Sequence, residues 1–195
     1  MQKLTRADLY SLEQYAEKRE GIRAQVMAHK KNRKIHAGPV ATLYFEDRMT
    51  MQYQIQEMLR VERIFEAGGI EEELGAYNPL IPDGSNWKAT FMIEEPDVEK
   101  RHKLLSTLVG IEDRVWVRVA GNEKVFALAD EDMERDTEEK TSAVHFLRFE
   151  LSVAMKDALK RGQPLAMGID HPKYSVSVEK VPEAVRQSLI NDLIL

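Results

Sequence analysis

The chain has 195 residues, of which 43% are hydrophobic and 31% charged, as in a folded globular protein of one domain. The formal net charge of −5 disfavours non-specific nucleic-acid binding, and no apolar run is long enough to span a membrane. Because the sequence has no cysteine, disulfides and thiolate nucleophiles are excluded, and any metal would need His, Asp or Glu ligands. The polar N-terminal stretch lacks the apolar core of a signal peptide, so we expect a cytoplasmic protein.

Apolar residues recur at helical spacing through most of the first eighty residues. The three helices expected there run from about residue 5 to the basic run 29–34, from 48 to about 65, and from 71 to 77. Gly68 and Gly69 are expected to close the second helix, because glycine readily follows the end of a helix. A strand is expected over 41–46, after the turn residues Gly38 and Pro39.

From Trp87 onward the apolar period shortens toward two, which is typical of strands. The strands are expected over 87–93, 115–119, 125–129, 142–151, 165–169 and 174–178. Helices are expected over 97–109 and 152–161 and from Pro182, and an acidic loop over 130–140. Hairpin-type connections favour a mostly antiparallel sheet.

The pattern as a whole predicts an α+β fold with about five helices in a single compact domain. Its three parts are a helical part over about 1–80, a sheet-rich part over about 87–180 and a C-terminal helix over about 182–195.

The second helix has an acidic residue on its apolar stripe. At 100° per residue, Glu62 falls near the centre of the stripe that runs from Met51 to Phe65. A carboxylate facing the core needs a cationic partner or a metal, unless it reaches solvent at the helix end. Arg148 is a candidate partner for a structural ion pair with Glu62, because it shares a strand face with apolar residues.

The opposite side of the same helix also carries apolar residues, Met49, Tyr53 and Ile64. A helix with two apolar sides usually packs on both. The second contact is either another helix of the same chain or a second copy of the protein, which would form a homodimer.

His145 alternates with apolar residues on one strand face. It is either a core histidine bonded to the backbone or an acid, or a ligand or catalytic residue. No phosphate-binding loop, dinucleotide fingerprint or hydrolase motif is present, and no spacing of Ser, His and acid selects a triad. The sequence therefore assigns no reaction.

Several stretches together resemble the bacterial family called domain of unknown function 3501. They are residues 36–39, 43–46, 54–63, 77–82, 141–149 and 170–172, and the likeness extends over nearly the whole chain. The family has no established activity and no assigned catalytic residues. The resemblance implies a bacterial cytoplasmic protein whose genes often lie beside those for rubrerythrin-like proteins and iron–sulfur oxidoreductase subunits.

Two functions follow from these observations. The first is a non-catalytic accessory or interaction protein without a cofactor, which works with a redox or peroxide-defence partner. The second is a metal-binding protein or metal-dependent enzyme that uses imidazole and carboxylate ligands for iron, manganese or zinc. Its candidate ligands are His36, Glu46, Glu57, Glu62, His145 and His171. Nucleic-acid binding through the basic run is disfavoured, because the run is short and lacks interleaved aromatic residues.

Overall fold

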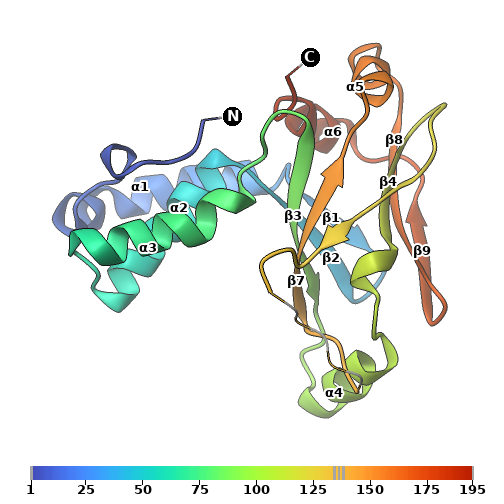
Figure 1. The fold of residues 1–195 in the computed structure, drawn as a ribbon, viewed down its shortest axis with the longest axis horizontal. Coiled ribbons are helices and arrows are strands. Elements are labelled where there is room, and N and C mark those ends of the chain that lie inside the picture. The colour runs from blue at the N-terminus through green and yellow to red at the C-terminus, as the bar shows by residue number, and fades with distance from the viewer. Residues whose placement is uncertain (1, 134, 136, 138, 195) are drawn as a thin grey trace.

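Two antiparallel sheets pack face to face in the computed structural model, and three helices project as an arm beside one of them (Figure 1). The structure describes residues 2–133, 135, 137 and 139–194; residues 134, 136 and 138 of the predicted acidic loop lie outside this part. The expected α+β class and antiparallel pairing are confirmed, with the strands divided between two sheets.

The five-stranded sheet takes strands from both halves of the chain, whereas the four-stranded sheet takes all of its strands from the second half. The five-stranded sheet has the order β1 (Lys34–Ala37), β2 (Ala41–Glu46), β3 (Asn86–Ile93), β7 (Val144–Glu150) and β6 (Leu128–Ala129). The four-stranded sheet has the order β5 (Val125–Phe126), β4 (Val115–Val119), β8 (Leu165–His171) and β9 (Tyr174–Val178).

The helices lie around this sandwich. In the described residues they are α1 (Leu12–Lys30), α2 (Arg48–Glu62), α3 (Ala67–Tyr77), α4 (Val98–Thr107), α5 (Val153–Lys160) and α6 (Glu183–Ile190). Short 3-10 turns cover Arg6–Asp8, Asn78–Leu80 and Glu112–Arg114. Figure 1 shows α1, α2 and α3 side by side in the arm and α5 and α6 at one end of the sheets.

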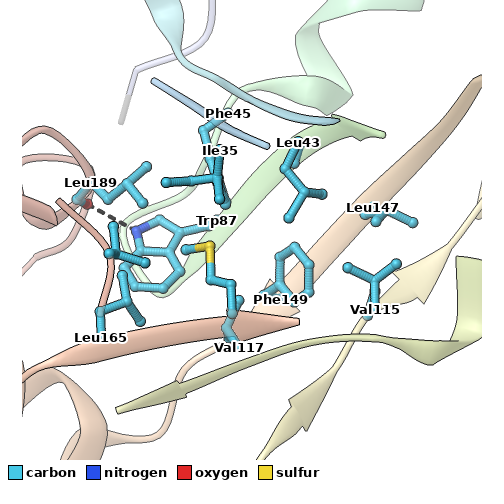
Figure 2. Close-up of a cluster of buried hydrophobic side chains, with 14 of the residues drawn as sticks. Ile35, Leu43, Phe45, Trp87, Val115, Val117, Leu147, Phe149, Leu165 and Leu189 are labelled. Carbon is cyan, nitrogen blue, oxygen red and sulfur yellow. Dashed lines mark hydrogen bonds between the residues drawn. The ribbon is translucent and has the colours of Figure 1, made fainter. Parts of the chain in front are cut away.

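The main core fills the space between the two sheets. Strand alternation sends Leu43, Phe45 and Trp87 inward, where their exposure is 1% or less (Figure 2). Burying such a side chain contributes about 2 kcal/mol. The Trp87 indole Nε1 donates to the main-chain oxygen of Leu189 at 2.8 Å, which attaches the last helix to the middle of the core.

The helical arm has its own smaller core, formed by residues such as Leu4, Ile55 and Leu74. Helix α1 begins at Leu12, later than predicted, because Ser11 Oγ accepts from the Gln14 amide and caps it there. Helix α1 packs against α2. The second side of α2 is therefore partly covered within the chain, since Tyr53 is buried but Met49 stays 44% exposed, and self-association stays a prediction.

Helix α2 ends at Glu62, earlier than the predicted Phe65. Arg63 takes the left-handed conformation with φ of 57°, and the Ile64 amide donates to the Leu59 oxygen at 2.9 Å, which closes the helix. The prediction that Gly68 and Gly69 close this helix is wrong, because both lie inside α3. The helix ends at an arginine rather than a glycine, and the residue type at position 63 gave no sign of this end.

The basic run after α1 is not a uniform charged surface. Strand β1 begins inside it at Lys34, and Arg33 is only 2% exposed. The Arg33 guanidinium pairs with Asp192 at 2.5 Å and donates to the main-chain oxygens of Phe45 and Glu46, both at 3.0 Å. Arg33 therefore connects the start of the sheet with the C-terminal end of the chain.

Candidate functional site

A groove lies where the helical arm meets the outer face of the five-stranded sheet. Two cavities of about 370 and 410 Å³ form it, and Leu80 and Phe146 line both of them. We call this feature the arm–sheet groove. Leu80 follows α3 on the arm side, whereas Phe146 comes from β7.

The floor of the first cavity follows directly from strand alternation. Residues such as Trp87 and Phe91 face the core, so their neighbours Thr90 and Met92 face outward beneath the arm. Val144 and Phe146 lie on the same face of β7, opposite Met92 and Thr90. The floor is therefore largely apolar and is made of two neighbouring strands.

Glu46 is the acidic group of the first cavity. It is 7% exposed, and its two carboxylate oxygens accept hydrogen bonds from the hydroxyls of Thr90 at 2.7 Å and Thr50 at 2.6 Å. Glu46 stands at the end of β2, one residue before Asp47, which caps α2 by accepting from the Thr50 amide at 2.9 Å. The strand-to-helix junction thus fixes the carboxylate beside the helix N-terminus.

The second cavity has charged walls. Arg148 forms a bidentate pair with Glu131, at 2.7 and 2.6 Å, and also contacts Glu150. Lys88 is half-buried between them, and this burial lowers its pKa. The predicted ion pair between Arg148 and Glu62 is wrong, because Glu62 lies exposed at the C-terminal end of α2.

A second polar cluster lies around His145, which is fully buried. Its Nδ1 lies 2.5 Å from Asp130 Oδ2, and its Nε2 lies 2.8 Å from Thr141 Oγ1 and 3.8 Å from Glu112 Oε2. Asp130 also accepts from the Phe146 amide and from Arg135. This geometry fits a core histidine bonded to an acid, the first of the two alternatives considered for it.

Sequence reasoning located His145 but missed its partners. Thr141 precedes it by four residues, and Asp130 follows β6, the strand that pairs with β7. Glu112 comes from a 3-10 turn before β4. Only correct pairing of β6 with β7 would have placed Asp130 beside His145.

The other candidate residues lie apart from these clusters. His36 is exposed on β1 and bonds Thr42 at 3.0 Å, and His171 contacts the Val109 oxygen at 3.2 Å. Glu57 connects α1 with α2, and its bidentate bond to Arg19 lowers its pKa to about 2.

The six candidate ligands thus occupy separate regions. Across the described parts of the chain, no three His, Asp or Glu side chains are grouped so that they could hold a metal ion. Within the same residues, no helix is long and apolar enough to cross a membrane.

Comparison with known proteins agrees with the fold. A crystal structure of a novel protein of unknown function from Burkholderia pseudomallei K96243 is 53% identical, with a TM-score of 0.94. The alignment covers 99% of this chain and 100% of that one. No curated protein matches the chain. The family profile described as protein of unknown function (DUF3501) matches residues 3–193, so the chain belongs to the DUF3501 family.

Proposed function

We propose that this protein is a non-catalytic accessory protein that binds a partner protein in the arm–sheet groove. The observation that carries the proposal is the apolar floor of the groove, where Met92, Val144 and Phe146 lie half-buried on the outer face of the sheet and line a cavity of about 370 Å³. Clefts of several hundred Å³ with apolar floors and a few polar groups are typical binding sites.

Charged residues at both ends of the groove support this function. Lys30 and Glu46 line the first cavity, and Lys88, Glu131 and Arg148 line the second. Fixed charges around an apolar centre contribute mainly to specificity and to the rate of association. The arm–sheet groove therefore has the apolar centre and polar surroundings of a selective interface.

The class of partner comes from the family resemblance. It directs the search to redox proteins of the bacterial cytoplasm, and rubrerythrin-like proteins and iron–sulfur oxidoreductase subunits are the first to test. In this proposal the partner carries out the redox chemistry, and the present chain contributes binding.

A charge placed in the groove floor should weaken the binding of the partner protein. We expect Val144→Arg to weaken binding to such a partner by at least about tenfold, because its long charged side chain would replace part of the apolar floor and occupy the cavity that Glu46 lines. The measurement is co-purification of the co-expressed proteins, followed by calorimetric titration of the partner that is retained.

Val153→Arg is the matched control. Val153 is 71% exposed at the start of α5 and does not line the groove, so this variant should bind as the wild type does. Both variants should keep the wild-type circular dichroism spectrum. Undiminished binding by a folded Val144→Arg protein would show that the groove is not the interface.

Metal binding is a second candidate function, favoured by the environment of His145. Asp130 holds Nδ1, as carboxylates do for metal-binding histidines. Nε2 bonds the Thr141 hydroxyl at 2.8 Å and lies 3.8 Å from Glu112, so a metal would replace the threonine contact. Elemental analysis of untagged protein purified without chelator should then find near-stoichiometric iron, manganese or zinc. His145→Gln should lose this metal and His171→Gln should keep it. A metal-free wild-type protein would reject this candidate alone.

A further inference from the structure

We infer that Glu46 is the specificity-determining residue of the arm–sheet groove, and that it receives the basic side chain, Lys or Arg, of a partner segment. This inference rests on the proposed function and adds to it the chemistry of the group that is recognised. It depends on three features of Glu46: its burial, its uncharged partners and the walls around it.

The Glu46 carboxylate is held by neutral donors. The hydroxyls of Thr50 and Thr90 donate to it, and it takes part in none of the ion pairs formed by the described residues. Arg33 donates to the main-chain oxygen of Glu46, but its charge is directed to Asp192 and to Asp47. Glu46 therefore faces the first cavity with its charge not neutralised by a side chain.

A buried carboxylate of this kind is well prepared to bind a cation. Each oxygen uses one lone pair for a threonine hydroxyl and keeps a second, so both can accept from an ammonium or guanidinium group. The threonines fix the orientation of the carboxylate beside the N-terminus of α2. Because these groups are already in place, an incoming cation would lose little free energy to rearrangement.

The walls of the cavity suit the stem of a basic residue. Met51, Met92 and Val144 provide apolar contacts for methylene groups, and Phe146 and Tyr44 provide aromatic rings. Lys and Arg bury their stems on such surfaces while the charged end meets a partner. Lys30 also lines the cavity, and a partner's cation would compete there with its ammonium.

A pair of short peptides tests this chemistry directly. The probes are acetylated and amidated leucyl-arginyl-leucine and the same peptide with glutamine in place of arginine. Titration of the full ¹⁵N-labelled protein should shift the amide signals of Thr50 and Thr90 with the arginine peptide. The glutamine peptide should bind about tenfold more weakly, as should the arginine peptide to Glu46→Gln.

Glu179→Gln is the control for net charge, since Glu179 pairs with Arg118 on the other sheet. This variant should bind the arginine peptide as the wild type does. Equal binding of the two peptides, or wild-type affinity in folded Glu46→Gln, would overturn the inference. Propylguanidine that binds as tightly as the peptide would overturn the assignment to a polypeptide segment and indicate a small organic cation.

The peptide and partner experiments distinguish failure of the role of Glu46 from failure of the proposed function. If Val144→Arg loses the partner while Glu46→Gln retains it with full affinity, the proposed function stands and the role of Glu46 is wrong. If Val144→Arg retains the partner, the groove itself is wrong as the interface.

Discussion

Replacing Arg33 with methionine should lower the free energy of unfolding by about 3–5 kcal/mol, although the methionine keeps most of the apolar stem. The substitution leaves the Asp192 carboxyl, itself 4% exposed, without its bidentate partner. It also removes the donors to the main-chain oxygens of Phe45, Glu46 and Ser188. Urea denaturation followed by circular dichroism measures the loss.

The loss should depend on pH in a defined direction. Burial raises the pKa of Asp192 to about 6, while Arg33 acts to lower it. Without Arg33 the folded-state pKa rises further above the unfolded value, and a raised folded pKa makes stability fall as pH rises between the two values. The deficit of Arg33→Met should therefore be larger at about pH 8 than at about pH 5.

Arg118→Met provides the comparison, because Arg118 pairs with Glu179 at the surface. This substitution should lower the free energy of unfolding by about 1 kcal/mol or less, as for other exposed ion pairs. A similar cost for both variants, or a deficit of Arg33→Met that shrinks as pH rises, would contradict the role assigned to Arg33.

Gly168→Ala should destabilise the protein by about 3 kcal/mol or more, the upper range for overpacking. A Cβ atom at Gly168 would lie 2.4 Å from the Trp116 ring carbon Cζ2 and 2.5 Å from the main-chain oxygen of Val176. Trp116 stands opposite Gly168 in the β4–β8 pair, and its Nε1 donates to Asp170 at 2.8 Å, which holds the indole in place. Because β9 supplies the second contact, the clash cannot be relieved by one side chain alone.

Thermal and urea denaturation, with tryptophan fluorescence as the signal, would measure the effect. Gly75→Ala is the matched control, since nothing lies within 4 Å of a Cβ atom there. Gly75 lies inside α3, so alanine should leave stability unchanged or raise it by up to about 1 kcal/mol. Equal stability of Gly168→Ala and the wild type would mean that Trp116 is not held against β8.

The sequence predicted the long strands better than the ends of the helices, for a physical reason, although it missed β1 and took β5 and β6 as one strand. Alternation in β3, from Trp87 to Ile93, reflects burial of one strand face and is visible residue by residue. The end of α2 depends on the left-handed conformation of Arg63, which is uncommon for a residue other than glycine. The predicted apolar stripe, which ran to Phe65, therefore extended past the true end of the helix at Glu62.

The candidate sites depended even more on contacts between distant segments. Glu46 was recognised as a chemically capable residue, but its threonine partners come from α2 and β3, and only the fold brings these together. Arg33 was interpreted as part of a basic run, because its acid partner Asp192 is 159 residues away. A pattern within one segment carries no information about such a pair.

The pairing of Arg33 with Asp192 also has a consequence for synthesis of the chain. A growing chain leaves the ribosome from its N-terminus, so Arg33 and the strands of the first sheet emerge long before Asp192 does. Until Leu189 and Asp192 are released, the Arg33 guanidinium lacks its acid partner and the Trp87 indole lacks the Leu189 oxygen. The sandwich can therefore reach its final packing only after the segment that holds Leu189 and Asp192 has been synthesised and released.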